Sequence, residues 1–500
     1  KSLEICIILS IVIGVIPSAQ AQGSLPGWTI PQQIPGYLDD TFTPLLISDN
    51  NRTVHAFANQ WVGENDRQPA IYYRKWSISG GWSSPVDIII WEDGEVIIQG
   101  AYLDKNGILH IIFWGGKDEI GNLYYSHAPV SLADRAPVWS EPKMIGPDAI
   151  YPSSAKLYGV GQGNLIAIYS SRVDKNGVYS IHSANSGKSW SEPVPVYFTE
   201  DLGYIPYSIQ MTTDGSNRIH AVWNIVDSTG NDLALFYSRY QPDSDTWREA
   251  YLLDKRINQK DYFGPSFPTI SISENKIVVF YNSGNPSSGY VGIGRPVQMV
   301  RVSDDGGDTW SEASQPFPLL QGRSGEHTLA EDSNGVIHAM FIQRIDRTIN
   351  GQYSPIGGIW HSEYRNNNWT EPERISIPFA AHDIHSVVSQ GNVLLATWRA
   401  DPGVGALGVY YTYKLLDAPE LPVELVPTLT VNSGEMSDEV ITSPLSTLPG
   451  GSQSITGVSI NWVEGAPIRK PLNPNIFLAI GAGPVIVLTV ALFLIRRLTH

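Results

Sequence analysis

Two short stretches in the second half of the chain combine side chains that can move protons. One holds Glu326 and His327, and the other holds His382, Asp383 and His385. A neutral histidine beside a tyrosine could abstract a proton from a uronate, which would make the protein a polysaccharide lyase. Alternatively, these polar side chains line a solvent-filled channel and have no catalytic role.

A repeat along the chain indicates which elements carry these residues. A tryptophan, small polar residues and then an apolar stretch recur 51 to 63 residues apart, at Trp28, Trp82, Trp139, Trp190, Trp247, Trp310 and Trp369. Each interval has room for four short strands, which make one propeller blade. The 46 Gly, 35 Pro and many aromatic residues suit strands and turns and disfavour long helices. We therefore expect an all-β, seven-bladed β-propeller over residues 22–416, with six blades as the less favoured alternative.

The last interval, residues 389–416, has no tryptophan strand after it. The strand that follows Trp28 has no blade of its own and could supply the missing edge. Strands from the two ends of the propeller would then pair and close the ring, which removes an exposed sheet edge. The repeated tryptophans are expected to lie in the core.

Four histidines recur in the repeat and could be mistaken for a metal set. His55, His110, His220 and His338 lie 27 to 31 residues before the next repeat tryptophan. Ligands of one ion must converge, whereas equivalent positions in successive blades are spread around a ring. We therefore expect these histidines to be structural, and we expect neither a metal site nor another cofactor.

One hairpin carries a recognisable motif. Residues 303–310 match the pattern S-x-D-x-G-x-T-W throughout, and residues 183–190 form a degenerate copy. In such a turn Gly307 permits the backbone conformation, Asp305 can accept backbone N–H bonds and Trp310 fills the space between strands. This pattern is the Asp-box, or BNR repeat, so the chain resembles the sialidase (neuraminidase) superfamily of propellers. In that family the box lies on the face away from the active site.

The resemblance implies a mechanism and a set of site residues. Sialidases grip the substrate carboxylate with three arginines and use a tyrosine, polarised by a glutamate, as the nucleophile. The residues that could take these roles are, for the carboxylate, Arg172, Arg344 and Arg399; for the nucleophile, Tyr207 or Tyr262 beside Glu326; and for the acid, Asp383 or Asp39. Sialidases usually open their first inner strand with Arg-Ile-Pro, but the matching residues 39–44 contain no arginine.

Other side chains are placed by the repeat at the expected functional face, where inner strands start and second strands end. Aromatic faces stack on sugar rings while polar groups bond hydroxyls. The remaining candidates for substrate binding are Trp61, Trp114, Trp223, Trp398, His327 and His385. The leading hypothesis is an exo-sialidase or related glycosidase that acts on a glycan or polysaccharide. The competing hypothesis is a non-catalytic propeller that binds glycans or proteins.

Composition and the chain ends bear on location and partners. The chain has 33 Lys and Arg against 49 Asp and Glu, a net charge of −16, which argues against a nucleic-acid partner. Residues 1–21 have the pattern of a signal peptide, and residues 417–475 are rich in Pro, Ser and Thr, as in a stalk. Residues 476–495 are uncharged and long enough to span a bilayer, and residues 496–500 would form a basic cytoplasmic stub. We expect a single-pass cell-membrane protein with its propeller outside.

Overall fold

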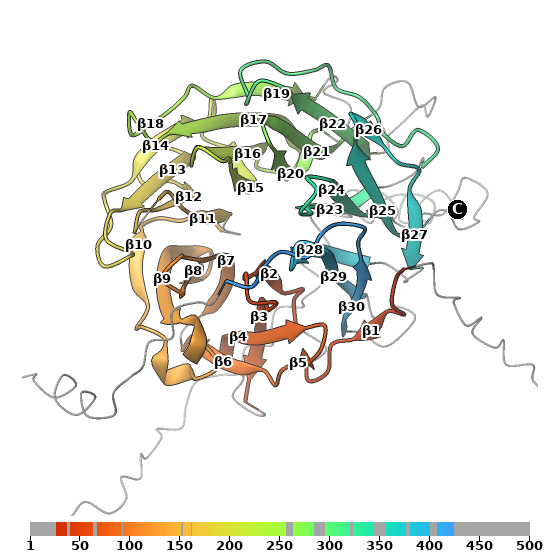
Figure 1. Ribbon diagram of the computed structural model, residues 1–500. Helices are drawn as coiled ribbons and strands as arrows, with labels where there is room; N and C mark the ends of the chain where they lie inside the picture. The colour runs from red at the N-terminus through yellow and green to blue at the C-terminus, as the bar shows by residue number, and fades with distance from the viewer. Residues whose placement is uncertain are drawn as a thin grey trace, which may run out of the picture. The chain divides into compact units, whose positions relative to one another are not determined.

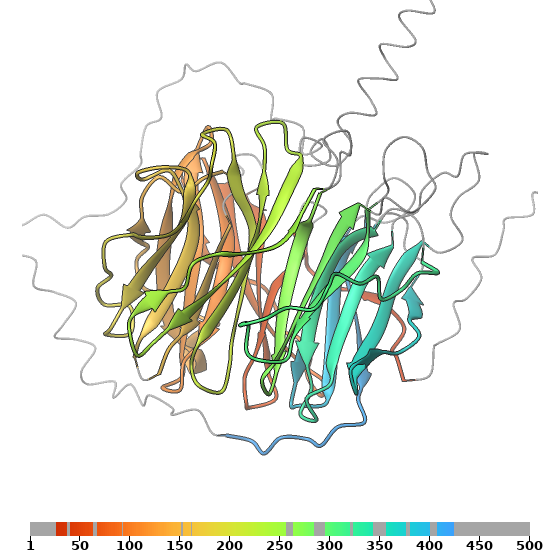
Figure 2. The same cartoon turned by 90° about the horizontal axis from the view of Figure 1, so that it is seen from above.

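The computed structural model describes residues 27–37, 41–63, 68–92, 94–151, 154–161, 163–256, 264–284, 296–320, 324–343, 357–376, 381–400 and 408–424. Their strands form seven antiparallel sheets arranged around a common axis, as Figure 1 shows along that axis and Figure 2 from the side. The prediction of an all-β, seven-bladed propeller is therefore confirmed, and the six-bladed alternative is wrong.

The blades are numbered here in chain order. Blade 1 contains β2 (Leu45–Ser48), β3 (Val54–Val62), β4 (Gln68–Ser77), β5 (Gly81–Trp82) and β6 (Val86–Ile90). Blade 2 contains β7 (Glu95–Leu103), β8 (Ile108–Lys117), β9 (Ile120–Pro129) and β10 (Lys143–Gly146), with the short 3-10 helices η1 (Val130–Leu132) and η2 (Ala136–Val138) before its last strand. Blade 3 contains β11 (Ala155–Gly159), β12 (Leu165–Ser171), β13 (Gly177–Ser183) and β14 (Val194–Phe198). Blade 4 contains β15 (Ile205–Thr213), β16 (Ile219–Val226), β17 (Asp232–Gln241), β18 (Thr246–Trp247) and β19 (Tyr251–Lys255).

The remaining blades complete the ring. Blade 5 contains β20 (Ser266–Ser273), β21 (Lys276–Gly284) and β22 (Pro296–Ser303). Blade 6 contains β23 (Ser324–Glu331), β24 (Ile337–Gln343), β25 (Gly358–Arg365), β26 (Asn368–Trp369) and β27 (Glu373–Ser376). Blade 7 contains β28 (Ala381–Ser389), β29 (Val393–Ala400), β30 (Gly408–Leu415) and, from the other end of the chain, β1 (Gln32–Gln33).

The ring closes as the sequence predicts. In Figure 1, β1 lies beside β30, and the register pairs Gln32 with Tyr411. Trp28 is 5% exposed, and its indole N–H donates a 2.8 Å hydrogen bond to the Glu373 carboxylate of blade 6. Lys414 donates a 2.7 Å bond to the same carboxylate. The two ends of the propeller are therefore joined by strand pairing and by a buried polar contact.

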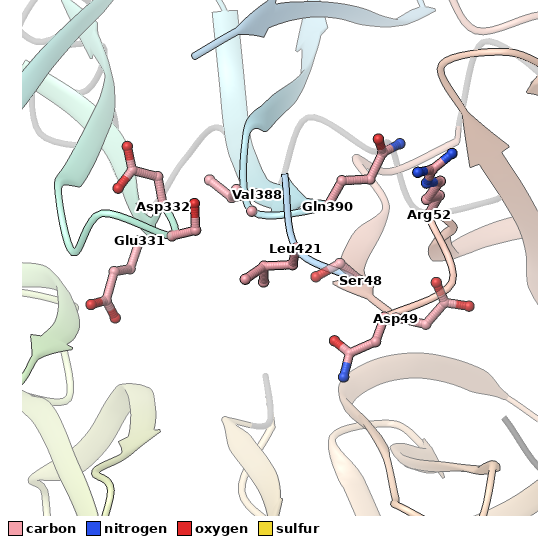
Figure 3. Close-up of a pocket in the computed structure, with 11 residues that line it drawn as sticks. Ser48, Asp49, Arg52, Glu331, Asp332, Val388, Gln390 and Leu421 are labelled. Carbon is pink, nitrogen blue, oxygen red and sulfur yellow. The ribbon is translucent and has the colours of Figure 1, made fainter. Parts of the chain in front are cut away.

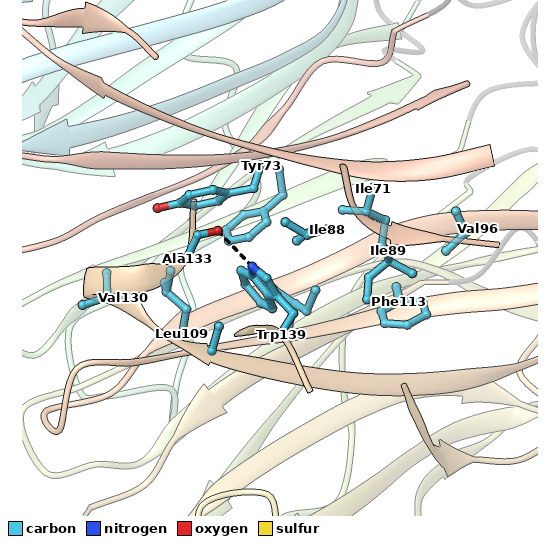
Figure 4. Packing of buried hydrophobic residues seen from close by; sticks show 13 residues of the cluster. Ile71, Tyr73, Ile88, Ile89, Val96, Leu109, Phe113, Val130, Ala133 and Trp139 are labelled. Atoms are coloured by element: carbon cyan, nitrogen blue, oxygen red, sulfur yellow. Dashed lines mark hydrogen bonds between the residues drawn. The ribbon is translucent and has the colours of Figure 1, made fainter. Parts of the chain in front are cut away.

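Packing between neighbouring blades forms the core. The second strand of each blade is sandwiched between adjacent sheets, so β24 is buried along its whole length instead of alternating. Between blades 1 and 2, the apolar side chains of Phe57, Tyr73 and Leu109 surround Trp139 (Figure 4). The Trp139 indole N–H donates a 2.9 Å bond to the Ala133 carbonyl.

The repeat tryptophans divide into two groups. Trp28 and Trp139 are buried, and the other five are half-buried at the rims of the core clusters. Because each contacts the apolar layer between two blades, the prediction of a core role is confirmed.

The four repeat histidines are bonded within their own blades, as predicted. In blade 1, His55 Nδ1 lies 2.7 Å from the Tyr73 hydroxyl and Nε2 lies 3.3 Å from Asp49 Oδ2. His110 and His220 make the same pair of contacts in blades 2 and 4, with Nδ1 2.7 Å from a tyrosine hydroxyl in each. His338 differs, because its Nδ1 faces a second histidine, His361.

The turn at 303–310 has the predicted hydrogen bonds. Asp305 Oδ1 accepts the backbone N–H groups of Asp308 (3.0 Å) and Thr309 (2.9 Å). These bonds, with one from the Thr309 hydroxyl, lower the pKa of Asp305 to about 2. Trp310 packs edge-on against Tyr237 of blade 4, with ring centroids 4.9 Å apart.

Blade 5 departs from the expected four strands. In the described residues it has three, and a single bridge between Ser314 and Val300 stands where the outer strand would pair. Pro316 and Pro318 follow directly in the sequence. Proline has no backbone N–H to donate, so a strand cannot continue through these positions.

The predicted signal peptide (1–21), most of the stalk (425–475), the membrane segment (476–495) and the stub (496–500) lie outside the described residues. Within the described part of the chain, no helix has the length and apolarity needed to cross a membrane. Residues 417–424 lie against the propeller, where the Glu424 N–H donates a 3.1 Å bond to the Asn50 carbonyl of blade 1. Export and anchoring stay predictions.

Candidate functional site

Four consecutive blades share an irregularity near the start of the innermost strand. In blades 4 to 7 this strand advances three residues while its partner advances two, as between Tyr207 and Gln210 of β15. The residue inside this β-bulge has a left-handed backbone at Ser208 (φ 50°), Phe267 (φ 49°) and Asp383 (φ 51°). Such a conformation costs a non-glycine residue about 1–3 kcal/mol, and bulges recur where side chains must be redirected at functional sites.

The bulges change which side chains reach solvent. In β15, Tyr207 and Ser208 are both half-buried and the next residue, Ile209, is fully buried. In β28, His382 and Asp383 repeat that pattern before Ile384. A regular strand would bury every second residue. In β15 and β28 the bulge thus places two consecutive polar side chains at one end of the ring, called here the strand-start face.

Tyr207 lies at the centre of the acidic part of this face. Burial is the largest cause that raises the pKa of Tyr207 to about 12, and three carboxylates add to it: Asp383, Asp232 and Glu326. The structure therefore brings Glu326 and Asp383 into electrostatic range of Tyr207, from three different blades. A tyrosine with a raised pKa keeps its proton at neutral pH, so Tyr207 is suited to donate a proton or a hydrogen bond and is not a ready phenolate nucleophile.

Asp232 is a site residue that the sequence analysis missed. Burial raises the pKa of Asp232 to about 8, although hydrogen bonds from Asn224 and Ser266 oppose the shift. The Asn224 amide donates a 2.8 Å bond to Asp232 Oδ1. At neutral pH Asp232 is therefore largely protonated, as a general acid must be. Its position at the first residue of β17, on the strand-start face, was the signal in the sequence.

The acidic area continues toward blade 2. The Tyr151 hydroxyl donates a 3.0 Å bond to Glu95. Burial, then the charge of Glu95, raises the pKa of Tyr151, and Tyr207 contributes to that shift. Two protonated tyrosines, from blades 3 and 4, are thus surrounded by acidic side chains from blades 2, 4, 6 and 7.

A second group of titratable side chains involves β28 and β11. Burial, then the positive charge of Lys156, lowers the pKa of His385 to about 4, so the imidazole is neutral at pH 7. Burial also lowers the pKa of Lys156 to about 8, and its ammonium donates a 3.1 Å bond to the Gln99 carbonyl. A neutral base and a cation are therefore neighbours inside the ring.

The predicted tryptophan ligands are placed differently. Trp114, Trp223 and Trp398 are at most 1% exposed and lie in the packing between blades, so their rings present no surface to a sugar. The reason is that the end of the second strand is still sandwiched between sheets. Trp61 is half-buried at the end of β3.

His327 also belongs to the packing between blades. It is 8% exposed, its Nε2 lies 3.0 Å from the Phe280 carbonyl, and its ring meets the Phe280 ring at 4.7 Å. It joins blade 6 to blade 5 and does not stand with Tyr207.

The described residues test the predicted arginine trio only in part. Arg172 is exposed beyond the end of β12, whereas the Arg399 guanidinium lies over the Phe42 ring, 5.4 Å from its centroid. Arg344, like the alternatives Tyr262 and Asp39, lies outside the described residues.

The opposite end of the ring contains a hollow of about 150 Å³. Figure 3 shows Leu421, from the segment after the propeller, between the turns that carry Asp49 and Asp332. Both aspartates already bond structural histidines, and the Leu421 N–H donates a 2.7 Å bond to the Gln390 carbonyl. We therefore assign the candidate site to the strand-start face and not to this hollow.

Comparisons with known proteins bear on the fold. No family model matches the sequence, and no curated protein is detectably similar to it. Among solved structures, the chain is similar to a polysaccharide lyase described as the PL25 ulvan lyase, with 12% identity, 77% of this chain and 96% of that chain covered, and a TM-score of 0.52. It is also similar to the BP39L lectin from Burkholderia pseudomallei, with 13% identity, coverage of 77% and 98%, and a TM-score of 0.51. The chain therefore shares its fold with a polysaccharide lyase and a lectin.

Proposed function

We propose that the protein is a glycan-active enzyme, a glycoside hydrolase whose active site is the acidic cluster around Tyr207. The observation that carries this proposal is the protonated Asp232 in range of a tyrosine that two further carboxylates surround. Glycosidases use one carboxyl group to protonate the leaving oxygen and a second as nucleophile or base. Environments that push the pKa values of neighbouring carboxyls apart provide both roles in one site.

Roles follow from the surroundings of each side chain. Asp232 would donate the proton to the glycosidic oxygen, because burial keeps it protonated at neutral pH. Asp383 or Glu326 would act as the ionised partner. Tyr207 would donate a hydrogen bond to the sugar or to that carboxylate, since its own proton is retained.

The charge of the site bears on the substrate. Three acidic side chains are among the causes that raise the pKa of Tyr207 and no arginine is among them, although Arg256 lies in electrostatic range of Asp232. An anionic sugar would be repelled there. We therefore favour a neutral glycan over sialic acid, which replaces the exo-sialidase reading with a related glycosidase.

The test is hydrolysis by the full-length protein across a panel of neutral polysaccharides and aryl glycosides, with new reducing ends as the readout. Asp232→Asn is expected to lower kcat about 100- to 10,000-fold on a natural linkage. On a dinitrophenyl glycoside, whose leaving group needs no proton, the same variant should lose far less of its kcat. The basic limb of the rate profile, expected near pH 8 in the wild type, should disappear in this variant.

The matched control is Glu331→Gln. Desolvation also raises the pKa of Glu331, to about 7, but this residue is exposed and lines the hollow at the opposite end of the ring. The Glu331→Gln substitution should leave kcat unchanged. Equal losses in both variants, or an unchanged Asp232→Asn enzyme, would contradict the assignment.

A polysaccharide lyase is the second candidate, favoured by the neutral His385 beside Lys156. His385 could remove the proton next to a uronate carboxylate while Lys156 neutralises its charge. A lyase forms an unsaturated product that absorbs ultraviolet light, whereas the product of a hydrolase does not. Retention on glycans without any turnover would instead support the binding hypothesis.

A further inference from the structure

The histidine–tyrosine pairs of the propeller follow one hydrogen-bonding rule. In blades 1, 2 and 4 the histidine Nε2 faces an aspartate at 3.2–3.4 Å, and Nδ1 lies 2.7 Å from a tyrosine hydroxyl. An Nε2–H that donates to the carboxylate leaves Nδ1 as an acceptor, and the hydroxyl supplies its proton. In blades 1 and 4 both ring nitrogens are therefore hydrogen-bonded without any other group, and in blade 2 the contact of Nε2 with Asp104 is only an ion-pair distance of 3.4 Å.

Blade 6 changes two residues of that pattern together. The tyrosine position is taken by His361, which faces His338. The residue paired across the strands with the repeat histidine is Lys75 in blade 1, His127 in blade 2 and Arg239 in blade 4, but Glu363 in blade 6. One hairpin thus replaces a hydroxyl and a basic side chain by an imidazole and a carboxylate.

When both outer nitrogens donate to carboxylates, the two blade-6 histidines cannot satisfy each other as neutral rings. His338 Nε2 lies 3.3 Å from Asp332, and His361 Nδ1 lies 2.9 Å from Glu373. If both outer nitrogens donate to these carboxylates, both inner nitrogens present lone pairs, and these two atoms are only 3.0 Å apart. A cation between them would remove the repulsion.

The third potential ligand completes a recognisable set. Glu363 Oε1 lies 4.0 Å from His338 Nδ1, and the three ligand atoms all lie within 4.8 Å of one another. Ligand atoms around tetrahedral zinc, with bonds of about 2.0–2.1 Å, stand about 3.3 Å apart. A small rotation of the Glu363 side chain therefore suffices. Among the described residues this is the one such group of three.

Each ligand is held from behind by a charged side chain. Asp332 supports His338, Glu373 supports His361, and the Arg365 guanidinium pairs with the second oxygen of Glu363. Such partners fix ring orientation and carboxylate direction at metal sites. Both histidines are buried, and Glu363 is 14% exposed. We propose that His338, His361 and Glu363 bind a zinc ion in blade 6, with a water or another donor as its fourth ligand.

The proposed zinc site lies next to Trp28, which lies in the segment whose strand closes the ring. The Trp28 ring meets His361 edge-on at 5.3 Å, and Glu373 bonds His361, Trp28 and Lys414. Zinc on His361 would fix the ring that Trp28 covers. Binding should therefore stabilise blade 6 together with the first and last strands of the propeller.

The test uses the full-length protein without an affinity tag, stripped with a chelator and titrated with ZnCl2 alone. We expect one zinc per chain by elemental analysis and calorimetry, and a higher melting temperature with zinc. His361→Tyr restores the pattern of blades 1, 2 and 4 and should fold while losing the zinc. Glu363→Lys introduces the residue that blade 1 has at this position and should weaken zinc binding at least tenfold. This second variant provides the test if His361→Tyr does not fold.

The control is His220→Gln, which removes an equivalent histidine in blade 4 and should leave zinc affinity unchanged. The proposal is overturned if the stripped wild type takes up no zinc. It is equally overturned if His361→Tyr and Glu363→Lys bind zinc as the wild type does, or if nitrogen NMR in the presence of zinc shows a proton shared between the two rings.

Discussion

Replacing Trp28 by alanine is expected to destabilise the propeller at its closure. The side chain is 5% exposed, packs on the blade 6–7 core and donates a 2.8 Å hydrogen bond to Glu373. Truncating a buried tryptophan costs about 3–5 kcal/mol. Part of this is the hydrogen bond to a charged acceptor, about 1.5–3 kcal/mol. Trp28→Phe, which keeps an aromatic ring but loses the N–H, should therefore cost about half as much as Trp28→Ala.

The assay is denaturant unfolding combined with hydrogen exchange. The Tyr413 N–H donates a 3.0 Å bond to the Thr29 hydroxyl, and the Thr29 N–H donates a 3.0 Å bond to the Tyr413 carbonyl. These amides should exchange faster in Trp28→Ala, whereas amides of β12, on the far side of the ring, should change only with global stability. A loss below about 1 kcal/mol with unchanged exchange at Tyr413 would refute the view that the Trp28 segment holds the ring shut.

Two further predictions concern the repeated packing elements. Burial, opposed by the hydrogen bond to Asp214, lowers the pKa of His220 to about 4, against about 6.5 when unfolded. The folded state therefore binds fewer protons than the unfolded state. The free energy of unfolding should be constant above pH 6.5 and should fall by about 3 kcal/mol as the pH drops toward 4. Unfolding midpoints that do not change over this range would contradict this prediction. Gly307→Ala should cost about 2–3 kcal/mol, because Gly307 has φ 91° and an added Cβ would overlap the Tyr237 hydroxyl. Gly215→Ala, where a Cβ meets nothing within 4 Å, should change the melting temperature little, and equal effects of the two substitutions would refute the steric argument.

The repeat carried most of the fold prediction. Tryptophans at regular intervals and the unpaired strand after Trp28 predicted both the number of blades and the closure. Such features are visible in a sequence because each blade must solve the same packing problem, so its solution recurs. The outer edge of blade 5 was mispredicted, since the tryptophan signal at Trp310 does not register the prolines that follow.

The candidate site was predictable only in part. Tyr207, Glu326 and Asp383 were chosen because they stand at the starts of inner strands and could take the roles that the sialidase resemblance implies, and the structure brings Glu326 and Asp383 within electrostatic range of Tyr207. Trp114, Trp223 and Trp398 were misjudged as ligand-binding, because exposure at a strand end depends on how far the neighbouring blades extend. Asp232 was missed for a related reason, since its raised pKa arises from burial by its neighbours.

The sequence by itself determined the architecture, because strand periodicity, turn residues and the spacing of tryptophans are local properties repeated along the chain. It also indicated that the four repeat histidines are structural, because they recur at equivalent positions. Only the tertiary structure decided which side chains come together. Across blades, Trp28 bonds Glu373 and Asp383 lies in electrostatic range of Tyr207, and within one hairpin of blade 6 His361 meets His338. These pairs join residues that are far apart in the chain or on adjacent strands, so their distances and burial are set only in the folded structure.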